Sequence, residues 1–151
     1  MTTKKGQAAL DFLMTYGWAI ALVVIVAAAL FALGVFDISN FVGTKAAGFS
    51  GVAVQAWQFT SGGTLTVKLT NQVGQRINVT AMSATIGSTT ATFNGTGKNV
   101  DIGATTDALP ATGFVPQTVG SGYQAIVTVN YTSLDTGFNA TTKGTLTGKV
   151  I

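Results

Sequence analysis

The sequence contains no cysteine, no histidine and no glutamate. Without cysteine the chain cannot form disulfides, and thiols give no information about its redox compartment. Without histidine it lacks the side chain that most often acts as a general base, a pH switch or a metal ligand. All five acidic residues are therefore aspartates.

Charge is also sparse, at 9% of residues. Apart from the adjacent Lys4 and Lys5, the basic residues are scattered, and no basic patch alternates with aromatic residues. We therefore expect no nucleic-acid partner. No lysine stands in a Ser-x-x-Lys spacing, and no glycine-rich segment has the strand-then-helix context of a phosphate-binding loop. We expect no enzymatic activity and no cofactor.

One long run, from Phe12 to Phe36, contains no charged residue. As a helix it extends about 38 Å, at roughly 1.5 Å per residue. The hydrocarbon core of a bilayer is about 30 Å thick, so the run predicts a helix that can span a membrane. Lys4 and Lys5 precede it, which predicts a cytoplasmic N terminus and an exported C-terminal part.

Beyond Phe36 an apolar stripe persists among polar residues. We expect the helix to continue to about Lys45 or Ala46 and to end at Gly48 or Gly51. This divides the chain into a stem at 7–48 and a head at 49–151. The small residues around Leu33 also allow an ordinary secretory cut after Gly34 as an alternative.

From Gly51 onward the hydrophobic period becomes two, which is typical of strands. Strands are expected at 51–60, 64–70, 77–86, 89–93, 98–102, 123–132 and 143–151. Between them, 103–122 holds Pro110 and Pro116 and is expected to be a long surface loop. Within 77–86, Ile77, Val79 and Ala81 share one face, and the phase slips at Met82, which indicates a bulge there. The fold class is therefore α+β, a long apolar helix followed by an all-β, Ig-like sandwich.

The residues KKGQAALDFL resemble the class III signal peptide of archaeal type IV pilins and archaellins. The resemblance implies that a prepilin peptidase cuts between Gly6 and Gln7, after Lys4 and Lys5, so that 1–6 is a leader. It also implies that Asp11 pairs with the new α-amino group of Gln7 on a neighbouring subunit. In a helix that begins at Gln7, Asp11 lies in the first turn, where the helix dipole favours a carboxylate. An interfacial cap without a partner is therefore the alternative reading of Asp11.

The function that this resemblance implies is that of a subunit of a type IV pilus-like adhesion filament. The expected partners are further copies of the chain, the prepilin peptidase, membrane lipid before assembly, and a pilus assembly ATPase with its membrane platform. The precursor is expected in the membrane and the mature protein in an extracellular filament. The many alanines of the apolar run permit close packing of helices, in lipid or among sister helices. Two alternatives are a single-span surface-anchored binding protein and an archaellin, the subunit of a motility filament.

The head contains four Asn-x-Thr sequons, which begin at Asn78, Asn94, Asn130 and Asn139. They are candidate N-glycosylation sites, and we expect the first and third on the outward parity of strands and the others in turns. Asp101 and Asp107 could bind Ca²⁺ together with backbone carbonyls, or could simply be solvated loop acids.

Aromatic residues offer a last candidate surface. Trp57, Tyr123, Tyr131 and Phe138 could form a sugar-binding face. The strand parity of Tyr123 and Tyr131 favours packing in the core instead.

Overall fold

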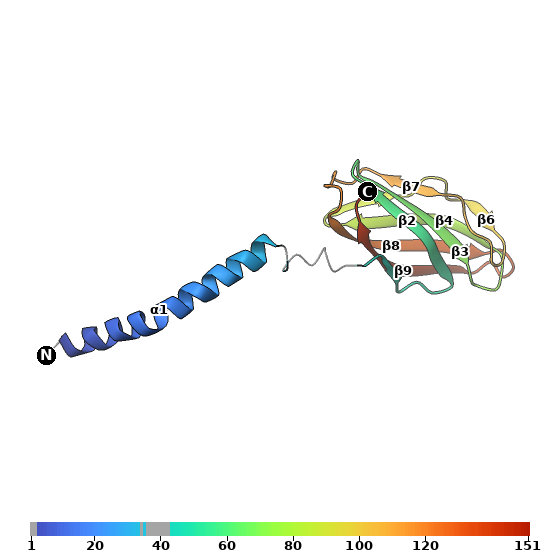
Figure 1. The fold of residues 1–151 in the computed structure, drawn as a ribbon. Helices are drawn as coiled ribbons and strands as arrows, with labels where there is room; N and C mark the ends of the chain where they lie inside the picture. Colours follow the sequence, from blue (N-terminus) through green and yellow to red (C-terminus); the bar gives the residue numbers. More distant parts are fainter. Residues whose placement is uncertain (1–2, 34, 36–42) are drawn as a thin grey trace. The chain divides into compact units, whose positions relative to one another are not determined.

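In this computed structural model, the structure describes residues 3–33, 35 and 43–151. The chain divides into two units, Met1–Asn40 and Phe41–Ile151. Among the described residues, the first contains one long helix, α1 (Thr3–Ala32), and the second contains nine strands (Figure 1). The fold class is therefore α+β, with an apolar N-terminal helix and an all-β head of two antiparallel sheets.

The residues of α1 are mostly alanine, leucine and other helix-compatible apolar types, and proline is absent from it. A turn follows at Leu33, whose backbone N–H donates to the carbonyl of Ala29 at 2.9 Å. The apolar helix expected from the sequence is thus present as far as Ala32. Its expected continuation over 36–42 lies outside the described residues.

The head contains short strands joined mostly by tight turns. They are β1 (Lys45–Ala47), β2 (Val52–Thr60), β3 (Thr64–Asn71), β4 (Ile77–Ile86), β5 (Thr89–Thr92), β6 (Lys98–Val100), β7 (Leu109–Thr112), β8 (Gly122–Ser133) and β9 (Asn139–Lys149). The larger sheet has the order β1-β9-β8-β4-β5, with β6 also pairing with β4, and the smaller sheet has the order β2-β3-β7. All the strand pairs are antiparallel.

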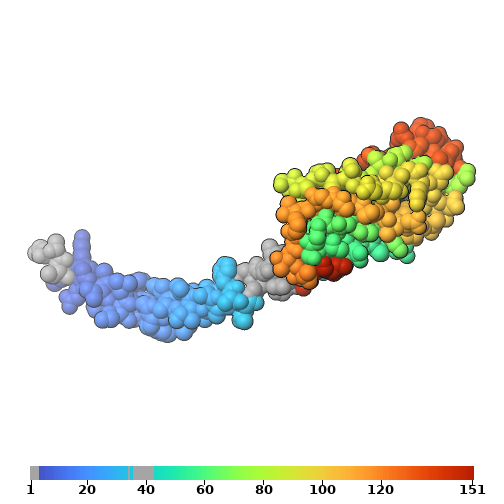
Figure 2. All heavy atoms as spheres, turned by 90° about the horizontal axis from the view of Figure 1, so that it is seen from above, coloured from blue at the N-terminus to red at the C-terminus, as the bar shows by residue number. Residues whose placement is uncertain are grey.

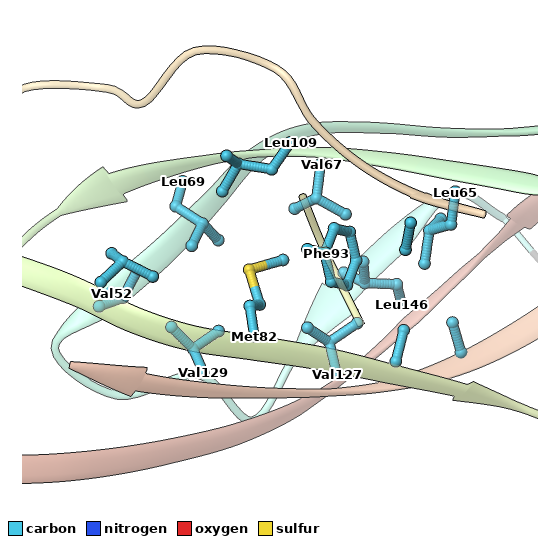
Figure 3. Close-up of a cluster of buried hydrophobic side chains, with 14 of the residues drawn as sticks. Val52, Leu65, Val67, Leu69, Met82, Phe93, Leu109, Val127, Val129 and Leu146 are labelled. Carbon is cyan, nitrogen blue, oxygen red and sulfur yellow. The ribbon is translucent and has the colours of Figure 1, made fainter. Parts of the chain in front are cut away.

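The core lies between the two sheets, and side chains from both of them meet there (Figure 3). The alternation in β3 and β8 is confirmed: Leu65, Val67 and Leu69 are buried from one sheet. From the other sheet, β8 buries Tyr123, Ala125, Val127, Val129 and Tyr131. Burial of these alternate residues removes apolar surface from water, which is the main favourable term in folding.

The expectation that helix extends to Lys45 or Ala46, with a stem to residue 48, is wrong. Lys45 to Ala47 form β1, which pairs with Thr145 to Thr147 of β9. The Thr147 hydroxyl donates to the carbonyls of Gly43 and Lys45, at 3.2 and 3.3 Å. These tertiary contacts outweigh the helix propensity of a Lys-Ala-Ala segment.

The expected irregularity of β4 is present, but it lies earlier than predicted. The register with β8 shifts between Val79 and Ala81, so Met82 returns to the core while Ala81 is exposed. The placement of Ala81 on the inner face with Ile77 and Val79 is therefore wrong. The extra residue of a bulge moves the parity of everything after it to the opposite face.

Two other boundaries also need correction. The expected loop at 103–122 contains β7, in which Leu109 and Ala111 are buried. Pro110 is tolerated there because β7 is an edge strand, and its carbonyl accepts a hydrogen bond from the N–H of Asn94 at 2.8 Å. The last strand begins at Asn139 rather than at Lys143, because Asn139 pairs with Thr132 directly after the β8–β9 turn.

Candidate assembly helix and surface sites

The most distinctive feature of α1 is the exposure of its large apolar side chains from Leu10 to Val26. Every large apolar side chain from Leu10 to Val26 is between 48% and 77% exposed. The helix is long and apolar enough to cross a membrane, by length and composition. A helix that is apolar on all sides is stable only when lipid or other helices surround it.

One side of α1 forms a shallow groove lined by aliphatic and aromatic side chains. The groove is lined by Phe12, Tyr16, Ala19, Ile20, Val23 and Val24. The rings of Phe12 and Tyr16 lie 4.8 Å apart and form one wall. Because Ala19 is small, a large side chain of another helix could approach the backbone here.

The expected cleavage bond, Gly6–Gln7, lies inside α1, because the helix begins at Thr3. Lys4, Lys5, Gly6 and Gln7 are all exposed. Glycine in a helix interior costs about 1 kcal/mol relative to alanine, so Gly6 weakens this first part of the helix. A peptidase that acts here would have to unwind only the beginning of α1.

The placement of Asp11 in the first helical turn does not hold for the intact chain. The first turn of α1 has no acidic residue, since the helix starts eight positions earlier, at Thr3. The exposed Asp11 carboxylate has no ion-pair partner among the residues that the structure describes. It reaches the first turn only in a chain that has been cut after Gly6.

Among the four sequon asparagines, Asn94 is exposed in the turn after β5, as expected. Asn139 is exposed too, but it is the first residue of β9 rather than part of a turn. Asn78 and Asn130 lie on the outward parity of their strands, yet both are only half exposed. Accessibility therefore differs from one sequon to another.

Two of the sequons are interlocked across β8 and β9, where Asn130 pairs with Thr141 and Thr132 pairs with Asn139. The hydroxyl of Thr141 donates to Asn130 Oδ1 at 2.8 Å, and that of Thr132 donates to Asn139 Oδ1 at 2.5 Å. Each sequon threonine thus contacts the asparagine of the other sequon. Strand register creates this arrangement, so sequence spacing alone could not reveal it.

Asn78 is held most firmly of the four. Its Nδ2 donates to Asn99 Oδ1 of β6 at 3.0 Å and makes a longer bond of 3.5 Å to the carbonyl of Gly97. Its Oδ1 is buried, and in the described part of the chain it has no hydrogen-bond partner. The amide nitrogen that a glycan would modify is therefore engaged in the folded head.

Asp101 and Asp107 both line a cavity of about 180 Å³ in the head. The floor of the cavity is apolar, from Val79, Val100 and Leu109. Lys98 Nζ lies 3.0 Å from Asp107 Oδ2, so a cation already neutralises that carboxylate. No group of three metal-ligating acids, cysteines or histidines occurs within the described residues.

The aromatic residues do not form one face. Tyr123 and Tyr131 are buried, as their parity predicted, whereas Phe138 is 76% exposed in the β8–β9 turn. Trp57 is half-buried, and its indole N–H donates to the carbonyl of Thr147 at 3.3 Å. Burial raises the pKa of the Tyr123 hydroxyl to about 12, against a smaller lowering by the hydrogen bond with Trp57.

No protein-family model matches this chain, and no curated protein matches it. A functional assignment therefore depends on the residues and geometry described above.

Proposed function

We propose that this protein is the structural subunit of an archaeal type IV pilus-like adhesion filament. The observation that carries the proposal is the exposure of every large apolar side chain of α1 from Leu10 to Val26, shortly after the residues KKGQ. Such a helix needs lipid before assembly and other apolar helices afterwards. The head, with its Ig-like sandwich, forms the outer layer of the filament and makes the contacts of adhesion.

The mechanism is assembly rather than catalysis. The prepilin peptidase hydrolyses the Gly6–Gln7 bond, and the assembly ATPase and its membrane platform extract the stem from the bilayer. The groove around Ala19 then receives a side chain from a sister helix. Asp11, now near the new N terminus, pairs with the α-amino group of Gln7 on a neighbouring subunit and offsets the cost of a carboxylate in apolar surroundings.

The decisive experiment is N-terminal sequencing and intact-mass measurement of material sheared from the cell surface, together with electron microscopy. A mature chain that begins at Gln7 and forms the repeating unit of filaments supports the proposal. A chain that retains residues 1–6 and stays in the membrane fraction would instead support a single-span anchored binding protein. Loss of swimming after deletion of the gene would indicate an archaellin.

A matched pair of glycine variants sharpens this test. Gly6→Ile should block the cut and leave an uncut precursor in the membrane, because a branched side chain replaces the small residue before the bond. Gly17→Ala, within the same helix and with nothing within 4 Å of the added methyl group in the chain itself, should be cut normally.

A further inference from the structure

Most exposed large apolar side chains of the head lie at its two ends. Seven large apolar side chains are exposed among the described residues of the head: Ile102, Val115, Val119, Ile126, Leu134, Phe138 and Ile151. Only Ile126 lies on a sheet face, where it pairs with Thr145 and Thr85. The outer face around it consists mainly of threonine, serine and asparagine.

We call the first end the β8–β9 pole, which comprises Ile102, Leu134 and Phe138. Leu134 and Phe138 belong to the β8–β9 turn, and the N–H of Leu134 donates to the carbonyl of Arg76 at 2.8 Å. Ile102 precedes Gly103, whose N–H donates to the carbonyl of Asn71, the last residue of β3.

The second end is the C-terminal pole, which comprises Val115, Val119 and Ile151. It surrounds the β2–β3 turn, where the carbonyl of Ser61 accepts the N–H of Gln117 at 3.2 Å. Because β3 runs from this turn to Asn71, the two poles lie at opposite ends of the strands. Figure 2 shows the orange-red β8–β9 turn at one end of the head and the dark red C-terminal residues at the other.

The unpaired charged side chains at the two poles are opposite in sign. At the β8–β9 pole, Asp101 is exposed and has no ion-pair partner among the described residues. Near the C-terminal pole, Lys149 ends β9 and Lys45 pairs opposite Thr147, and both are exposed without an ion-pair partner in the described chain. The three acids of the head, Asp101, Asp107 and Asp135, all lie away from the C-terminal pole.

We infer that the heads of successive subunits stack, with the β8–β9 pole of one copy on the C-terminal pole of the next. The inference rests on the proposed filament and adds the surface through which its heads associate. Each pole has the apolar centre and charged rim that are typical of a protein interface. When two different patches meet, one end of the stack still has a free β8–β9 pole and the other end a free C-terminal pole. The stack can therefore grow at either end without closing into a ring.

The absence of cysteine makes a direct test possible, because introduced thiols are the only ones present. Full-length chains carrying both Phe138→Cys and Val119→Cys would be assembled in cells and treated with a bis-maleimide cross-linker. Both positions are exposed, so the substitutions should not disturb folding. A ladder of covalent multimers is the expected result. A second pair, Leu134→Cys with Val115→Cys, tests the same contact independently.

Each single-cysteine variant serves as a control and should give only monomers, because the proposed contact joins unlike poles. Dimers from Phe138→Cys alone would show that like poles meet and would overturn the inference. So would intact filaments from which neither double variant yields multimers. In that case the proposed function would survive, whereas a wild-type chain that forms no filaments would refute the function itself.

Charge reversal gives a second readout that a purely local effect would not reproduce. Asp101→Lys should reduce the yield of cross-linked multimers several-fold in the Phe138→Cys, Val119→Cys background. Adding Lys149→Asp should restore most of that yield, since the pair regains opposite signs. If the two reversals reduce the yield independently, with no recovery in combination, charge pairing between the poles is excluded and the stacking inference fails with it.

Discussion

Gly144 of β9 lies directly against the ring of Phe49. A Cβ atom at residue 144 would lie 2.5 Å from Phe49 Cδ2 and 2.7 Å from the carbonyl oxygen of Ala47. The glycine therefore lets the segment after β1 lie flat on the large sheet, where the N–H of Ser50 donates to the Thr142 hydroxyl at 2.8 Å. This contact attaches the beginning of the head to its last strand.

We predict that Gly144→Ala destabilises the head by about 1 to 3 kcal/mol, the usual cost of overpacking a tight site. Urea unfolding of the detergent-solubilised full chain would measure the change. Gly62→Ala is the matched control, because nothing lies within 4 Å of the methyl group that it adds. In the Gly144→Ala background, the further change Phe49→Ala should restore part of the lost free energy of unfolding, because it removes the ring that the new methyl group contacts. Equal stability of Gly144→Ala and wild type would contradict the contact between Gly144 and Phe49.

The contrast between β8 and β1 shows how much of this fold could be predicted from sequence. In β8, five inward apolar residues alternate with outward ones, so its buried face follows from the pattern alone, and the expected strand at 123–132 is one residue short at each end. In β1, three residues become a strand only because Thr147 and Phe49 hold them against β9. A local sequence pattern carries no information about a partner strand that lies about a hundred residues away.

Asn71 is buried at the end of β3 and joins three segments of the chain. Its Nδ2 donates to the carbonyls of Gln75 at 2.7 Å, Val100 at 3.0 Å and Asp101 at 3.2 Å. Its Oδ1 accepts the N–H of Val73 at 2.9 Å. The strand expected from the sequence ends at residue 70, one residue before Asn71, and the alternating pattern did not indicate a buried polar residue here.

We predict that Asn71→Leu, which keeps a similar volume, lowers the free energy of unfolding by at least roughly 3 kcal/mol. A buried N–H and several carbonyls would lose their partner, at about 1 to 3 kcal/mol for each unsatisfied group. Thermal unfolding by circular dichroism would detect the shift. The neighbouring exposed residue provides the control, since Gln72→Leu should change stability by less than about 0.5 kcal/mol. Equal melting temperatures of Asn71→Leu and Gln72→Leu would argue against a stabilising role for the hydrogen bonds of Asn71.

The sequons should differ in glycan occupancy if modification follows folding. We predict that Asn94 is the most fully modified and Asn78 the least, because the glycan attaches to the amide nitrogen and that of Asn78 is donated to Asn99. Glycopeptide mass spectrometry of filaments would measure occupancy at each site. Asn99→Ala should raise occupancy at Asn78 and leave Asn94 unchanged. Equal occupancy at Asn78 and Asn94 in the wild type would show that modification precedes folding or ignores it.

The candidate site divides in a similar way between what sequence can and cannot predict. The apolar run and the residues KKGQ are contiguous, so both could be read directly from the chain. The interlocked pair of Asn130 with Thr141 depends on the register of β8 against β9. The two poles of the head likewise gather residues from separate turns, and only the folded topology brings these residues together.

Tyr123 should make the stability of the head fall at alkaline pH. Its ring is buried against Phe59, with centroids 5.0 Å apart, and burial raises the pKa of its hydroxyl from 10.0 to about 12. Between these values the unfolded chain loses the proton while the folded chain keeps it, so the unfolded state binds fewer protons and stability decreases as pH rises. The contribution of the protonated Tyr123 hydroxyl to the free energy of unfolding is complete below pH 10. It falls by roughly 1 to 3 kcal/mol as the pH rises to 12. Denaturant unfolding of the full chain at a series of pH values from 9 to 12 would measure this slope. Tyr123→Phe should remove that part of it, whereas an unchanged slope in the variant would assign the alkaline loss to other groups.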